Sequence, residues 1–161
     1  MGLKDKLLQE NQDQRSARDH REAEQRAQDS IPKLRDAIQG LCTLVAHEFL
    51  LEYERERLAI IHPLTTKLES GALKSIFFPY LAISMRGTEI TLKPIGPVFG
   101  SPCRVDLTNG EQTFAVLWDG GGNEARNWTI VPIAGDILVR DQAKVLSKEG
   151  FEEALEKLLG L

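Results

Sequence analysis

The chain has 161 residues, of which 42% are apolar and 27% are charged, as in an ordinary globular domain. Its formal net charge is −4, because 24 Asp and Glu outnumber 20 Lys and Arg. Nucleic acid is therefore a disfavoured partner, since binding to phosphates needs a clustered surplus of basic residues.

The sequence lacks the segments that direct a chain to a membrane or to an oxidising compartment. Its densest apolar run, residues 41–51, is interrupted by His47 and Glu48 and is too short to span a bilayer. The first residues, MGLKDKLL, have no signal-peptide apolar region. Cys42 and Cys103 show no metal-ligand spacing. We expect a cytoplasmic protein with two reduced, buried thiols, no metal and no cofactor.

Residues 1–30 form a polar lead of helix-favouring composition. Between residues 3 and 31 there is no Gly or Pro. The lead contains six Lys or Arg and seven Asp or Glu, so it is not a basic arm for nucleic acid. Two interpretations remain open. The lead either extends the following helix or packs beside a partner through Leu3, Leu7 and its alanines, or it is frayed in solution.

Residues 31–58 predict a long helix with one buried face. Ser30 suits the N-cap, and Pro32 suits the first turn. Leu44 and Leu51 lie beside the main apolar stripe, so we expect the helix to contact a second neighbour. The stripe recurs in steps of three and four residues and consists of Ile31, Leu34, Ile38, Leu41, Val45 and Phe49.

The chain after this helix is predicted to change from helix to sheet. The sequence His62-Pro63 disfavours helix at His62, and residues 64–68 fit a short further helical turn that Gly71 would end. From Ser75 the apolar residues alternate, which indicates an antiparallel meander. The expected strands lie near residues 75–84, 88–95, 103–108, 111–118 and 127–133, and residues 137–140 fit a sixth short strand.

Three turns set the expected register of this meander. They are residues 86–87, the Asn109-Gly110 turn, and the loop of residues 119–127. Asn-Gly is the strongest short hairpin signal and predicts a two-residue type I′ turn. In each hairpin apolar residues then face one another across the strands. The expected pairs include Ile83 with Ile90, Leu81 with Leu92, Val105 with Phe114, Cys103 with Val116, Val116 with Ile130, and Trp118 with Trp128.

A C-terminal helix is predicted after Ser147, which suits the N-cap. Its apolar face consists of Phe151, Leu155, Leu158 and Leu159.

The most unusual local feature is a glycine-rich loop. Consecutive glycines let a ligand approach the backbone, and the loop amides could cradle an anion. The loop lacks the Lys of a phosphate-binding P-loop, so a flexible hairpin loop is the competing interpretation. The candidate ligand-binding residues are Asp119, Gly120, Gly121, Gly122, Asn123 and Arg126.

No catalytic or metal-ligating set is identified. His47-Glu48 begins like a zinc-protease helix, but position 51 holds Leu51 instead of the second His. Cys103 is expected on the apolar face of the sheet, where a thiol is structural rather than nucleophilic.

The predicted fold class is α+β, with a long N-terminal helix or helical hairpin, an antiparallel meander of about five strands and a C-terminal helix. Residues 1–30 form the extension, and residues 31–161 form one domain. The sequence favours a non-catalytic protein–protein interaction or self-assembly module that acts through its N-terminal helices. The expected partner is a second copy in a homodimer, or another protein, with Leu44 and Leu51 at the interface. The alternative is a small-ligand-binding protein or enzyme with a pocket between sheet and helix.

Overall fold

The computed structural model describes residues 2–68, 76–98 and 101–161, and it leaves the side chains of residues 20 and 23–30 undescribed. The chain divides into two units, Met1–Lys33 and Leu34–Leu161. No helix among the described residues is both long enough and apolar enough to cross a membrane.

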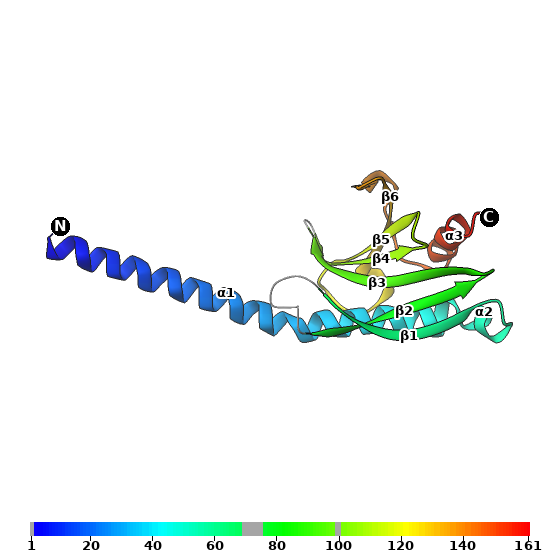
Figure 1. The fold of residues 1–161 in the computed structure, drawn as a ribbon, viewed down its shortest axis with the longest axis horizontal. Coiled ribbons are helices and arrows are strands. Elements are labelled where there is room, and N and C mark those ends of the chain that lie inside the picture. The colour runs from blue at the N-terminus through cyan, green and yellow to red at the C-terminus, as the bar shows by residue number, and fades with distance from the viewer. Residues whose placement is uncertain (1, 69–75, 99–100) are drawn as a thin grey trace. The chain divides into compact units, whose positions relative to one another are not determined.

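The architecture is α+β, as predicted, with an N-terminal helix, an antiparallel sheet and a C-terminal helix (Figure 1). The described helices are α1 (Leu3–Leu44), the π-helix η1 (Val45–Phe49), α2 (Leu51–Arg55), the 3-10 turns η3 (Ala125–Asn127) and η4 (Arg140–Gln142), and α3 (Lys148–Leu158). The described strands are β1 (Ile60–Lys67), β2 (Phe77–Met85), β3 (Thr88–Val98), β4 (Ser101–Thr108), β5 (Thr113–Trp118), β6 (Trp128–Ala134), β7 (Ile137–Leu138) and β8 (Lys144–Val145).

Helix α1 begins far earlier than the predicted N-cap. It runs from Leu3 through position 30, so Ser30 does not cap a helix there, and Pro32 lies inside α1 rather than in its first turn. The backbone of residues 3–30 is helical, and whether the lead is frayed in solution stays a prediction. The expected end at residue 58 is also too late. After Arg55 the chain turns, and Arg57 adopts a φ of 62°.

One face of α1 and η1 lies in the core of the larger unit. The predicted stripe from Leu34 to Phe49 is buried and joins the apolar side chains of the sheet in one cluster, whereas Ile31 is only partly buried. In the π-helix the Leu50 N–H donates to the Val45 carbonyl at 2.9 Å. The wider π turn brings Leu50 onto the buried face together with Phe49, which the α-helical period did not predict.

The sheet follows the order β1-β2-β3-β4-β5-β6-β7 with antiparallel neighbours, and β8 pairs with β6. The described residues thus form eight strands instead of five. Strand β1 replaces the short helical turn expected at residues 64–68, because Ile and Thr favour strands and Pro63 disfavours helix. Pro63 is tolerated because β1 lies at the edge of the sheet. Gly71 lies outside the described residues.

Two of the three predicted hairpin registers are confirmed. The structure pairs Ile83 with Ile90, Leu81 with Leu92, Val116 with Ile130, and Trp118 with Trp128. The tryptophan rings lie on one face with their centroids 6.4 Å apart, within the range expected for an aromatic pair.

The register predicted from Asn109-Gly110 is wrong by two residues. The connection is a four-residue loop, 109–112, in which Asn109 Oδ1 accepts hydrogen bonds from the backbone N–H groups of Glu111 and Gln112 at 2.9 and 2.7 Å. This side-chain turn replaces the type I′ turn. An even shift leaves each side chain on its predicted face. The observed pairs are Cys103 with Trp118, Val105 with Val116, and Leu107 with Phe114.

Helix α3 closes the core against η1. Ser147 caps it as predicted, with Oγ accepting from the Gly150 N–H at 3.0 Å. The rings of Phe49 and Phe151 lie 5.6 Å apart between centroids. The loop of residues 109–112 is tied to the end of α3, because Asn109 Nδ2 donates to the Leu158 carbonyl at 2.8 Å.

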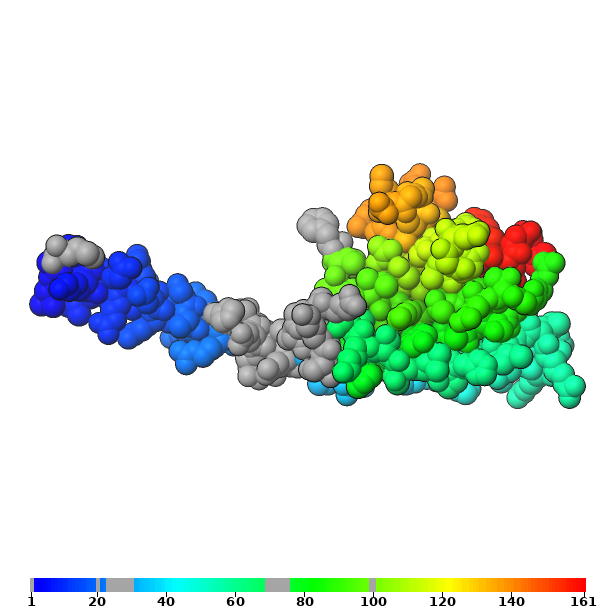
Figure 2. Space-filling model, in the orientation of Figure 1, coloured from blue at the N-terminus to red at the C-terminus, as the bar shows by residue number. Residues whose placement is uncertain are grey.

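The hairpin of β6 and β7 projects from the surface of the larger unit, as Figure 2 shows in orange. At its tip, Ile137 is 72% exposed to solvent.

We predict that Gly110→Val lowers the free energy of unfolding by about 1 kcal/mol or more, because Gly110 has a φ of 96° that a β-branched residue adopts only with strain. A Cβ at this position would meet no heavy atom within 4 Å, so the substitution tests backbone conformation alone. Urea denaturation provides the measurement. Glu111→Val, in the same loop without a positive φ, is the control. Equal midpoints for the two variants would contradict the assigned loop.

Candidate functional site

The glycine-rich loop is held by its own hydrogen bonds. Asp119 Oδ1 accepts from the Gly121 N–H at 2.7 Å, and Asn127 Nδ2 donates to both carboxylate oxygens of Asp119 at 3.2 Å. Trp118 Nε1 donates to the Gly122 carbonyl at 2.8 Å. These bonds fix the loop as an ordered turn at the end of β5.

Arg126, the expected charged contact, pairs with Glu124 at 2.8 Å between Nε and Oε2. Both side chains are largely exposed, so this ion pair contributes little to stability. The hollow beside them measures about 520 Å³ and is lined by Gly121, Gly122, Asn123, Glu124, Arg126 and Asn127. The structure thus brings most of the candidate residues to one open surface. Anion binding there stays a prediction.

The same loop packs against α1. A Cβ at Gly40 would lie 2.8 Å from the Cβ of Asn123 and 3.1 Å from its carbonyl oxygen, so only glycine fits this approach. The groove beside the contact measures about 370 Å³, and Leu44 and His47 are among its lining residues.

The two interface candidates differ from fully exposed surface leucines. Leu44 is partly buried and packs against the core of its own chain. Leu51, in α2, is partly buried as well. Each leaves part of its side chain in solvent, and a role at an interface stays a prediction.

The cysteines are structural. Burial raises the pKa of both thiols, Cys42 and Cys103, to about 12, so both are protonated at neutral pH. His47 and His62 lie exposed on η1 and β1. Among the residues that the structure describes, no group of three His, Cys, Asp or Glu side chains is placed to hold a metal ion.

A neighbouring carboxylate raises the pKa of Tyr53 in α2. Its hydroxyl donates to the Glu152 carboxylate of α3. This hydrogen bond, with smaller contributions from burial and from the negative charges of Glu152, Glu156 and Glu52, raises the pKa of Tyr53 to about 12. The contact joins α2 to α3 and leaves the phenol protonated at neutral pH.

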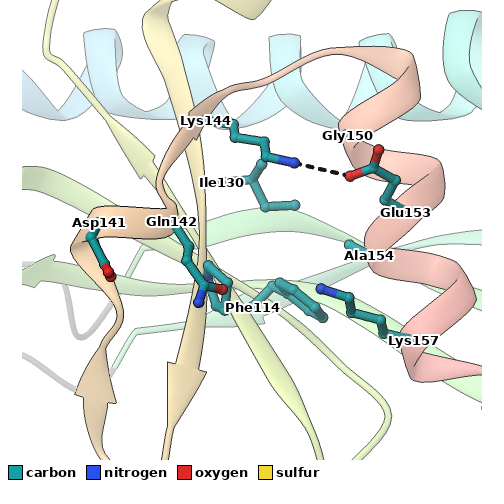
Figure 3. Close-up of a pocket in the computed structure, with 10 residues that line it drawn as sticks. Phe114, Ile130, Asp141, Gln142, Lys144, Gly150, Glu153, Ala154 and Lys157 are labelled. Atoms are coloured by element: carbon teal, nitrogen blue, oxygen red, sulfur yellow. Dashed lines mark hydrogen bonds and ion pairs between the residues drawn. The ribbon is translucent and has the colours of Figure 1, made fainter.

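The alternative interpretation expected a pocket between sheet and helix without naming its residues, and a pocket lies between α3 and the sheet (Figure 3). It measures about 380 Å³ and receives side chains from β5, β6, η4, β8 and α3. Lys144 Nζ lies 3.1 Å from Glu153 Oε2 and joins β8 to α3 at one end. The lining residues are Phe114, Ile130, Pro132, Asp141, Gln142, Lys144, Gly150, Glu153, Ala154 and Lys157.

The residues of this pocket were not identified from the sequence because they share no motif or period. Phe114 and Ile130 were expected to be ordinary inward-facing strand residues, and residues 141–144 were assigned to no element. The available signal was Pro132, which lies within β6 and has no N–H to donate to a neighbouring strand.

A second groove, of about 290 Å³, lies between the helical layer and the first two strands. Cys42 and His47 contribute from the helix, and Tyr80 contributes from β2. Lys93 Nζ lies 5.3 Å from the centroid of the Tyr80 ring.

Comparisons with known proteins identify no relative: the chain matches no protein-family model, no curated protein and no solved structure.

We predict that Gly40→Ala lowers the free energy of unfolding by about 1 kcal/mol. Ala is favoured over Gly inside a helix by about 1 kcal/mol, but the clash with Asn123 introduces overpacking that costs about 1–3 kcal/mol. Thermal or urea unfolding measures the difference. Asp36→Ala, on the exposed side of the same helix, is the control and should change stability by less than about 0.5 kcal/mol. A stabilised Gly40→Ala variant would show that the loop does not rest on the helix.

Proposed function

We propose that the chain is a non-catalytic protein–protein interaction or self-assembly module that acts through its N-terminal helix, with a second copy of the chain as the partner. One observation supports the proposal above the others. Every side chain that the structure describes between residues 2 and 22 is exposed, although the backbone is helical from Leu3.

A helix of this kind gains little stability from its own residues. Isolated helices are marginal in water, and most helical stability in proteins comes from packing of an apolar face. The described part of the lead offers an exposed ion pair, Arg18 Nε with Glu22 Oε1 at 3.3 Å, which contributes only tenths of a kcal/mol. Glu22 and Arg26 also have the spacing of a favourable helical ion pair, but the Arg26 side chain lies outside the described residues.

The apolar residues of the lead gather near its start. Leu3 and Leu7 are one helical turn apart and follow one face, and Leu8 lies beside them. Their exposed fractions are 74%, 51% and 53%. Full burial of a leucine side chain contributes about 1.5–3 kcal/mol, so a partner helix that covered the three would stabilise the helical lead.

A second copy fits the charge of this segment. The lead holds six basic and seven acidic residues, so two leads meet without a large net repulsion. A two-fold dimer uses the same surface on both chains and is the commonest assembly of soluble proteins. Leu44 and Leu51, both partly exposed, remain the candidates for a second part of the interface.

We predict that the full chain forms dimers at micromolar concentration, and that the triple variant Leu3→Glu, Leu7→Glu, Leu8→Glu is monomeric and less helical. The reason is that three like charges would replace the apolar surface that a partner helix covers. Sedimentation equilibrium gives the mass, and far-UV circular dichroism gives the helix content.

The matched control places three glutamates at exposed apolar positions outside the lead: Leu58, Ile137 and Leu161, which are 55%, 72% and 69% exposed. It should keep the dimer. A strictly monomeric parent chain, or a dimer that survives in the lead variant, would contradict self-assembly through the N-terminal helix.

A further inference from the structure

The pocket beside α3 results from an interruption in strand pairing. Strand β8 pairs with β6 at residues 129–130, and β7 pairs with it at residues 133–134. Between these two pairings lies Pro132, which has no N–H to donate, and its carbonyl accepts from the Val139 N–H at 2.9 Å. The 3-10 turn η4 connects the two short strands, and the hollow lies between η4, β6 and α3.

The floor of this pocket is apolar. Phe114, Ile130 and Ala154 are exposed by only 4%, 5% and 2%, yet all three line the pocket. An apolar ligand body would contact the small part of these side chains that faces the hollow.

The rim above this floor carries two cations, Lys144 and Lys157, and two anions, Asp141 and Glu153. Lys144 is already paired with Glu153. Lys157 has no ion-pair partner among the residues that the structure describes, and its ammonium group points toward the Phe114 ring in Figure 3. Gln142 lies on the other side of the pocket from Lys157 in Figure 3, and Asp141 lies beyond Gln142.

We propose that this pocket binds a small amphipathic monocarboxylate. Its apolar body rests on Phe114, Ile130 and Ala154, and its carboxylate accepts hydrogen bonds from the Lys157 ammonium and the Gln142 amide. A volume of about 380 Å³ lies within the range of small-molecule sites. The site belongs to residues 114–157 and is independent of the lead.

A monoanion fits better than a phosphate dianion or an amine. A single unpaired ammonium balances one negative charge, and the carboxylates of Glu153 and Asp141 at the rim would repel a second. An amine would place its charge beside Lys157. The amide of Gln142 offers a neutral donor, which suits the second oxygen of a carboxylate.

The test is a titration of the isotope-labelled full chain with 4-phenylbutyrate, followed by two-dimensional ¹H–¹⁵N NMR. We expect saturable shifts in residues 114, 130, 142 and 150–157, with a Kd of about 1 mM or tighter. The matched neutral amide, 4-phenylbutanamide, should bind at least about tenfold more weakly, because a charged hydrogen bond is lost.

Variants of Lys157 test whether its ammonium group binds the carboxylate of the ligand. Lys157→Gln should raise the Kd of 4-phenylbutyrate at least about tenfold. Lys157→Arg should retain binding, because it keeps the charge and the donors. Lys67→Gln, which changes an exposed lysine of β1 outside the pocket, should leave binding unchanged. Lys157 is itself exposed, so these variants keep the fold, and unchanged resonances elsewhere in the spectrum confirm it.

Several results would overturn the proposal. They are the absence of saturable shifts at millimolar 4-phenylbutyrate, equal binding by Lys157→Gln, and tighter binding of 4-phenylbutylamine or inorganic phosphate than of the carboxylate. The dimer of the preceding subsection is measured separately by sedimentation, so the two proposals fail independently.

Discussion

The larger unit depends on the burial of one helical stripe against one face of an antiparallel sheet. Such a sheet has an apolar face that needs a cover, and a helix with an apolar stripe supplies it. Ile38 and Val45 have no exposed surface, and neither do Ile83, Ile90 and Leu92 on the strands. Because these side chains belong to one cluster, the helix and the sheet stabilise each other.

The loops of the larger unit satisfy their polar atoms within the chain and contact its helices. The glycine-rich loop reaches α1 at Gly40 and satisfies its own polar atoms through Asp119 and Asn127. The loop after β4 is tied to the end of α3 through Asn109. In contrast, the described side chains of residues 2–22 remain in solvent. The two units thus differ in how much of their side-chain surface is buried. Regions with little buried surface unfold locally most readily.

Local patterns predicted much of this fold. The alternation of apolar residues and the turn at residues 86–87 were sufficient to pair Ile83 with Ile90, and the loop of residues 119–127 was sufficient to pair the tryptophans. The helix stripe was recognised because its period is local. Ser147 was recognised as a cap for the same reason.

The errors arose where tertiary context overrides a local signal. Asn109 uses its side chain to build a longer loop, and the sequence Asn-Gly does not reveal that choice. Pro32 lies inside a helix although proline usually marks a helix start. Strand β1 was hidden because its edge position leaves it without a buried alternation. The pocket beside α3 combines residues from five segments, and no spacing in the sequence brings Phe114 to Lys157.

Native-state amide hydrogen exchange tests the mutual dependence of helix and sheet most directly. The account predicts that the amides of Ile38, Leu41 and Val45 exchange with the same opening free energy as those of Ile83 and Val116, because all belong to one core. If the helix amides exchanged through an opening of much lower free energy while the strand amides remained protected, the mutual dependence of helix and sheet would be contradicted.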